Sequence, residues 1–197
     1  VGPEVQGFAV GDRVWLVLAQ HERPYGTAAQ LTVQPTAKVA PLPEAADFDL
    51  GASVGVPAVT AHRALTASEF GPARLGPGAL TGRTVLVAGG AGAVGNAAIQ
   101  LARWSGATVV ATVSSEEKAA LAVAAGAHHV VNYRVADVAE EVRALCPDGV
   151  DISVEVAPAQ NVAVDLDLVK VHGLVSIYAN NGGDEMTMPL RAAFGKN

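Results

Sequence analysis

Four glycines between residues 89 and 95 form the part of the sequence whose spacing most directly indicates chemistry. They lie in a stretch, 85–102, whose residues predict a buried strand, a turn and a helix. Their two overlapping patterns are Gly90-x-Gly92-x-x-Gly95 and Gly89-x-x-Gly92-x-x-Gly95. Such glycines let the chain turn sharply, let backbone approach a phosphate, and let the helix pack closely on the strand. Because the unpaired N–H groups of a helix's first turn face an anion, the stretch predicts a site for a dinucleotide's pyrophosphate.

Residues at the ends of the next two predicted strands indicate which dinucleotide binds. Ser114 and Ser115 stand where a site for NAD usually carries an acid that binds the ribose 2′-hydroxyl. Hydroxyl groups donate to a 2′-phosphate that a carboxylate would repel, and Lys118 supplies a positive charge one helical turn later. Tyr133 and Arg134 end the following strand and are placed to flank the adenosine. We therefore predict NADPH as the cofactor.

The same serines have a structural alternative. Ser114 followed by Glu117 matches a capping box for the helix that begins there. Glu116 and Glu117 would repel a phosphate if they pointed toward it. One serine can cap a helix and border a phosphate, so the two roles are compatible.

Strands and helices alternate from Thr84 onward, and these elements must position the residues above. The predicted strands are 84–88, 108–113, 129–132, 151–156 and 174–179, and the predicted helices are 94–105, 116–125, 136–145 and 161–170. Gly106 and Gly126 each follow a helix, as C-terminal capping glycines do. Apolar, β-branched strands in this alternation predict an α/β fold, a doubly wound parallel sheet of Rossmann type. A complete sheet of this type has six strands, and we expect the sixth beyond Asn197.

The first part of the chain has a different pattern. Short apolar runs broken by proline and glycine predict strands at 13–19, 28–33 and 37–41. Asp49 is placed to cap a helical stretch that runs to about Ser68, with a kink at Pro57.

Five motifs occur along the chain in a fixed order. They are Gly11-Asp-Arg-Val14, Gly26-Thr-Ala-Ala-Gln30 leading to Leu42-Pro43, Gly55-Val-Pro-Ala-Val-Thr-Ala-His-Arg-Ala-Leu65, the glycine turn, and Gly126-Ala-His-His-Val-Val-Asn-Tyr133. This series resembles the medium-chain dehydrogenase/reductase superfamily, in its zinc-free quinone oxidoreductase (ζ-crystallin-like) branch, over nearly the whole chain. The resemblance implies part of a GroES-like substrate domain at 1–45, a connecting helical segment at 46–80, and an NADP-binding Rossmann domain at 81–197 whose C-terminal part is missing.

The resemblance also implies an activity: transfer of hydride from NADPH to quinones or α,β-unsaturated carbonyls, without zinc, by a cytoplasmic homodimer or other homo-oligomer. By position, the implied cofactor contacts are Thr60 near the nicotinamide, Gly92, Ala93 and Val94 at the pyrophosphate, Ser114, Lys118 and Tyr133 at the 2′-phosphate and adenosine, and Asn161 after the fourth strand. Ala179 replaces a frequent glycine where the chain passes the nicotinamide. Glu155-Val-Ala-Pro158 replaces a frequent Asp-x-x-Gly, so we expect a stiffer or displaced loop. No catalytic residue is assigned.

Composition excludes several other functions. A formal charge of −6 argues against non-specific binding to nucleic acid or to anionic membranes. The single cysteine, Cys146, allows no internal disulfide and no multi-cysteine zinc site. Two alternatives stay open: an enoyl reductase unit of a polyketide or fatty-acid synthase, and a non-catalytic NADPH-binding protein with a crystallin-like or RNA-binding role.

Some further motifs match functional patterns by chance. Gly51-Ala-Ser-Val-Gly55 has the spacing of a hydrolase nucleophile elbow but no apolar strand precedes it, and Ser115-Glu-Glu-Lys118 lacks its partner motifs. His128 and His129 are neighbours on a strand and point to opposite faces, which suits no single metal. His62 could face the nicotinamide, although packing on a helix face explains it as well.

Overall fold

The computed structural model describes residues 1–196 and divides the chain into two compact units, Val1–Val59 and Thr60–Asn197. Helix α2 (Pro57–Leu65) contains the boundary. The division into segments 1–45, 46–80 and 81–197 stays a prediction; Asn197 lies outside the described residues. No helix within 1–196 is long and apolar enough to cross a membrane.

The first unit contains a small antiparallel sheet. Strand β1 (Val14–Leu16) pairs with β2 (Val39–Pro41), which follows the short 3-10 helix η1 (Thr36–Lys38). The strand predicted at 28–33 is wrong: this segment forms no regular structure, and Leu31 is 91% exposed. Leu31 and Val33 pack against no strand or core among residues 1–196 and stay exposed, so alternation alone does not produce a strand.

The predicted helix at 49–68 is two helices. Helix α1 (Phe48–Val54) is capped by Asp47, whose Oδ1 accepts a hydrogen bond from the Leu50 N–H at 2.7 Å, so the predicted cap at Asp49 is wrong by one half turn. Pro57 begins α2 instead of kinking one continuous helix. A proline fits the first helical turn because the N–H it lacks would have no partner there.

Arg13 fixes the loop that leads into α1. Its guanidinium group donates hydrogen bonds to the carbonyl oxygens of Pro43, Glu44 and Ala46 at 3.2, 3.0 and 2.5 Å. The same group lies 4.6 Å from the ring centroid of Phe48. One planar cation thus connects β1 to the start of the helix.

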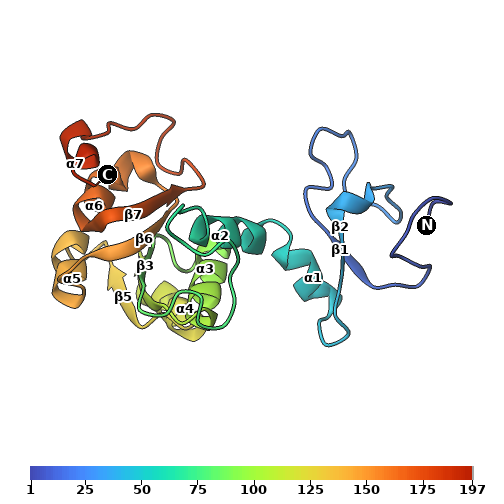
Figure 1. Ribbon diagram of the computed structural model, residues 1–197, viewed down its shortest axis with the longest axis horizontal. Helices are drawn as coiled ribbons and strands as arrows, with labels where there is room; N and C mark the ends of the chain where they lie inside the picture. The colour runs from blue at the N-terminus through green and yellow to red at the C-terminus, as the bar shows by residue number, and fades with distance from the viewer. Residues whose placement is uncertain (197) are drawn as a thin grey trace. The chain divides into compact units, whose positions relative to one another are not determined.

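The second unit is built on a five-stranded parallel sheet (Figure 1). Its strands are β3 (Thr84–Val87), β4 (Thr108–Val113), β5 (His129–Asn132), β6 (Val150–Glu155) and β7 (Val169–Ile177), in the order β5-β4-β3-β6-β7. Its helices are α3 (Ala93–Trp104), α4 (Glu116–Ala125), α5 (Val138–Leu145), α6 (Pro158–Leu168) and the short α7 (Leu190–Phe194). The predicted α/β fold of Rossmann type is therefore confirmed.

Alternate residues of the strands form two separate cores. Val85 and Val87 of β3 pack with Ile99 on the face that α3 and α4 cover, whereas Leu86 packs with Val142 on the face that α5 and α6 cover (Figure 1). Side chains on a strand alternate between faces, so apolar residues at every position require helices on both sides.

In the second unit, two predicted element starts differ from the structure by three residues or more. Helix α6 begins at Pro158 and not at 161, because proline again occupies the first turn. Strand β7 begins at Val169 and not at 174, and its pairing with β6 is irregular between Val150 and Ile152. Here His172 has a φ of 60°, a conformation that hydrophobic patterning does not indicate.

A buried carboxylate connects three strands at the amino end of the sheet. Asp151 of β6 accepts hydrogen bonds from the Thr84 N–H at 2.8 Å and from Arg83 and Lys170 at 2.9 Å each. Burial by itself would raise the pKa of Asp151, but these donors and the charge of Lys170 outweigh it and hold the pKa below 3.8.

We predict that Asp151→Asn lowers the free energy of unfolding at neutral pH by about 2 kcal/mol, because the charged hydrogen bonds are lost. The folded-state pKa is depressed, so this stabilisation is present above 3.8 and disappears as the pH falls through the folded-state value. Urea unfolding of both proteins across acidic pH measures the difference. A deficit that stays constant down to strongly acidic pH would contradict the assignment.

Candidate functional site

The glycine turn leads directly into the amino end of α3. Gly92 is the N-cap residue, with φ −72° and ψ 162°, and no side chain caps the helix there. The first-turn N–H groups of Ala93, Val94 and Gly95 follow it, and such groups have no partner within the helix. An uncapped amino end on a twelve-residue helix can hold an anionic group by hydrogen bonds and by the helix dipole.

Close packing explains why glycine occupies the other positions of the turn. A Cβ atom on Gly95 would lie 2.4 Å from the carbonyl oxygen of Gly89, and one on Gly90 would lie 2.8 Å from the Cβ of Ala111. Gly89 has a φ of 67°, which side chains rarely adopt. These glycines therefore let α3 pack directly against the turn, and let the turn pack directly against β4.

Thr112 of β4 fixes this turn, a role that the sequence analysis missed. Its hydroxyl accepts a hydrogen bond from the Gly89 N–H at 3.3 Å, and its carbonyl oxygen accepts one from the Gly90 N–H at 2.9 Å. A hydroxyl residue near the end of an otherwise apolar buried strand is the signal that could have indicated it.

A cavity of about 290 Å³ lies at the carboxyl ends of β3, β4 and β6. It occupies the place where the strand order reverses, which is where ligands bind open α/β sheets. Its lining residues are Leu86, Ala88, Gly89, Thr112, Tyr133, Val138, Glu155, Val156, Ala157, Gln160, Asn161, Val164 and Asp165. Of the predicted site residues, the cavity brings together Gly89, Tyr133 and Asn161.

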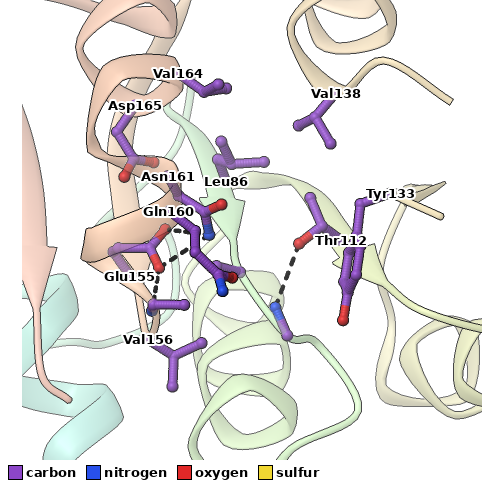
Figure 2. A pocket seen from close by; sticks show the side chains of 13 residues that line it. Leu86, Thr112, Tyr133, Val138, Glu155, Val156, Gln160, Asn161, Val164 and Asp165 are labelled. Atoms are coloured by element: carbon purple, nitrogen blue, oxygen red, sulfur yellow. Dashed lines mark hydrogen bonds between the residues drawn. The ribbon is translucent and has the colours of Figure 1, made fainter. Parts of the chain in front are cut away.

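Glu155 and Asn161 form one wall of the cavity, opposite Thr112 and Tyr133 (Figure 2). The Glu155 carboxylate is 1% exposed and accepts hydrogen bonds from the Ala157 N–H and from the Asn161 side-chain amide, the latter at 3.2 and 3.3 Å. The loop after β6 is therefore held by its own glutamate. Asn161 is a predicted site residue, whereas Glu155 carries no predicted binding role.

A second buried acid, Asp165, lies one helical turn beyond Asn161 on α6. Its Oδ1 accepts a hydrogen bond from the Ser153 hydroxyl at 2.7 Å. Burial and the nearby charge of Glu155 raise the pKa of Asp165 to about 7. Burial and the same charge raise the pKa of Tyr178 to about 12. The spacing of Asn161 and Asp165 on one helix face was the available signal, but an acid on a helix usually faces water.

The predicted 2′-phosphate residues lie at the end of β4, outside the cavity lining. Lys118 Nζ donates a hydrogen bond to Ser114 Oγ at 2.9 Å, and the Lys118 N–H donates to Ser115 Oγ at 3.3 Å. Ser115 is thus the helix cap. The predicted capping box of Ser114 with Glu117 is wrong, because a cap at Ser114 would need the helix to begin at 115, whereas it begins at Glu116. The Tyr133 N–H donates to the Val113 carbonyl oxygen at 3.0 Å, so Tyr133 lies at the neighbouring strand end.

Ala179 is held against the loop after β6 by its neighbours in sequence. The Tyr178 N–H donates to the Glu155 carbonyl oxygen at 3.1 Å, and the Asn181 N–H donates to the Val156 carbonyl oxygen at 2.9 Å. Its predicted contact with the nicotinamide stays a prediction.

Thr60 and the histidines lie apart from the cavity. Thr60 is half-buried on α2, and His62 Nε2 accepts a long hydrogen bond, 3.5 Å, from the Leu75 N–H. His128 Nδ1 accepts a hydrogen bond from the Val109 N–H at 2.9 Å, and burial and the charge of Arg103 lower its pKa. These contacts support packing roles for both histidines.

Comparison with known proteins gives related sequences and structures. A family model described as zinc-binding dehydrogenase matches residues 93–197. Quinone oxidoreductase from Rattus norvegicus is 36% identical over 187 residues, which cover 94% of this chain and 53% of the rat protein. The 2-haloacrylate reductase of a Burkholderia species is 33% identical over 186 residues, 93% of this chain and 52% of that protein. The chain thus spans about half the length of these relatives.

Solved structures match over the full chain. Escherichia coli quinone oxidoreductase, crystallised with NADPH, has a TM-score of 0.82 and 26% identity, covering 100% of this chain and 57% of that one. Within residues 1–196, no three His, Cys, Asp or Glu side chains are grouped to hold a metal ion.

We predict that Gly95→Ala lowers the free energy of unfolding by about 3 kcal/mol, because the added methyl group would overlap a backbone oxygen that cannot move freely. Gly76→Ala is the matched control, since a Cβ there has no atom within 4 Å. Urea unfolding measures both. Equal stability of the two variants would contradict the close approach of α3 to the turn.

Proposed function

The chain belongs to the zinc-binding dehydrogenase family, within the medium-chain dehydrogenase/reductase superfamily. From this premise we propose that it binds NADPH and reduces a quinone or an α,β-unsaturated carbonyl without zinc. The observation that carries the proposal is the uncapped, glycine-packed turn at 89–95 beside a cavity at the reversal of strand order. A relative crystallised with NADPH supports the same cofactor.

The pyrophosphate, the adenosine and the 2′-phosphate of the cofactor each have a proposed place. The first-turn N–H groups of Ala93 and Val94 hold the pyrophosphate. The cavity beside Tyr133 takes the adenosine, and Ser114 with Lys118 binds the 2′-phosphate, whose charge the lysine neutralises. NADPH supplies the hydride, so the task of this chain is to bind and orient the cofactor.

The proposed substrate class rests on the names of relatives. One is named a quinone oxidoreductase, and another is named for 2-haloacrylate, an α,β-unsaturated acid. Both are electron-poor conjugated molecules that accept hydride at carbon or oxygen. An enoyl reductase unit and a non-catalytic NADPH-binding protein are the alternatives. The homo-oligomer and the cytoplasmic location remain predictions.

We predict that Lys118→Ala weakens NADPH binding about tenfold, equivalent to about 1.4 kcal/mol, and leaves NADH binding unchanged, because only NADPH carries the 2′-phosphate. Arg191→Ala on α7 is the matched control for the loss of an exposed positive charge. Isothermal titration of both cofactors measures the effect. A wild-type protein that prefers NADH tenfold or more would contradict the assignment.

Turnover separates the proposed activity from its alternatives. We expect NADPH oxidation with a 1,4-quinone or an enone as acceptor. Turnover of an enoyl thioester alone would favour the synthase enoyl reductase. NADPH binding without turnover of any of the three acceptors would favour the non-catalytic protein.

A further inference from the structure

Two buried carboxyl groups stand together in the cavity wall, and neither forms an ion pair with a basic side chain among residues 1–196. Glu155 is 1% exposed and Asp165 is 2% exposed, and both line the cavity (Figure 2). The groups that face them are Ser153 on β6, Asn161 and Gln160 on α6, Tyr178 after β7, and Thr112 and Tyr133 across the cavity. Two basic side chains on adjoining elements are engaged elsewhere: Arg143 pairs with Asp167, and Lys170 with Asp151.

Two adjacent negative charges cannot both persist in such surroundings. Glu155 is the member with donors, since its carboxylate accepts hydrogen bonds from the Ala157 N–H and the Asn161 amide. Asp165 Oδ1 accepts one from Ser153, but its buried Oδ2 has no hydrogen-bond partner among residues 1–196. The Asp165 and Glu155 side chains lie within hydrogen-bonding reach of each other, so a protonated Asp165 could donate to the Glu155 carboxylate.

We propose that Asp165 is a positioning residue: in its protonated form it donates a hydrogen bond to the Glu155 carboxylate, and it thereby holds Glu155 where it fixes Asn161 and the loop after β6. That this wall contacts a cofactor rests on the proposed function. When the proton leaves to solvent, two like charges face each other and Glu155 turns away from its donors. The raised pKa of Asp165, about 7, places this loss near neutral pH.

The first test needs no cofactor. Infrared spectroscopy detects the C=O stretch of a protonated carboxylic acid, and NMR detects the side-chain amide of Asn161. We expect a carboxylic-acid band in the wild type that disappears as the pH rises through about 7, together with a shift of the Asn161 amide signals. Asp165→Asn should lack the band and show no amide shift in this range, because its own amide donates to Glu155 at every pH. A wild type without the band, or an amide shift that persists in Asp165→Asn, would overturn the proposal.

The second test uses NADPH affinity. We expect wild-type affinity to fall roughly tenfold as the pH rises through about 7, about 1.4 kcal/mol. Asp165→Asn should keep the low-pH affinity throughout, whereas Asp165→Leu should bind weakly at every pH. The matched control is Asp151→Asn. Asp151 is also a buried acid, but it lies on β6 away from the cavity lining, so this variant should keep the wild-type pH dependence of NADPH affinity. Wild-type pH dependence in Asp165→Asn would refute the positioning role.

The two proposals can fail separately. If no variant binds NADPH but the infrared and NMR changes occur, then the proposed function fails and the shared proton stands. If NADPH binds with the same pH dependence in wild type and Asp165→Asn, then only the positioning role fails.

Unfolding experiments add a further check. Because the folded-state pKa of Asp165 is raised, its contribution to the free energy of unfolding is lost as the pH rises from 3.8 through about 7, and Asp165→Asn should not show this loss.

Discussion

The close approach of α3 to the β3 turn is the constraint on which the site depends. The carbonyl oxygen of Gly89 occupies the space that a side chain of Gly95 would need. This contact places the amino end of α3 at the carboxyl ends of the strands. Gly90 packs closely against Ala111 of the adjacent strand, β4. The cavity, the serine end of β4 and the loop after β6 all lie around a helix that is fixed in this way.

The cavity wall shows how one polar group determines the state of the next. Glu155 holds the loop backbone and Asn161, and its charge acts on both Asp165 and Tyr178. At the opposite end of the sheet Asp151 is also buried, but Arg83 and Lys170 keep it charged. Both Asp151 and Asp165 are buried, so burial does not explain why the pKa of one is lowered and that of the other is raised. The difference is that Asp151 has cationic donors.

Much of the second unit could be predicted from the sequence because its local signals agree. Helix α4 runs over the predicted residues, 116–125, since a serine cap precedes it and Gly126, with φ 108°, ends it. The first unit was predicted less well, because a strand at 28–33 requires a neighbour that sequence alternation cannot supply. The same holds for the site: the glycine turn is a local pattern, whereas the meeting of Glu155 with Asp165 depends on how α6 returns over β6.

If the proposed function holds, Thr112 has a consequence for any attempt to change the cofactor preference. Its hydroxyl and carbonyl oxygen hold Gly89 and Gly90, and it lies one position before the end of β4, directly after which Ser114 follows. The proposed 2′-phosphate segment and the proposed pyrophosphate turn are thus connected through one residue of β4. If an engineered acid at the end of β4 shifts the backbone there, Thr112 would pass this shift to the glycine turn. The cofactor selectivity and the cofactor affinity would then change together.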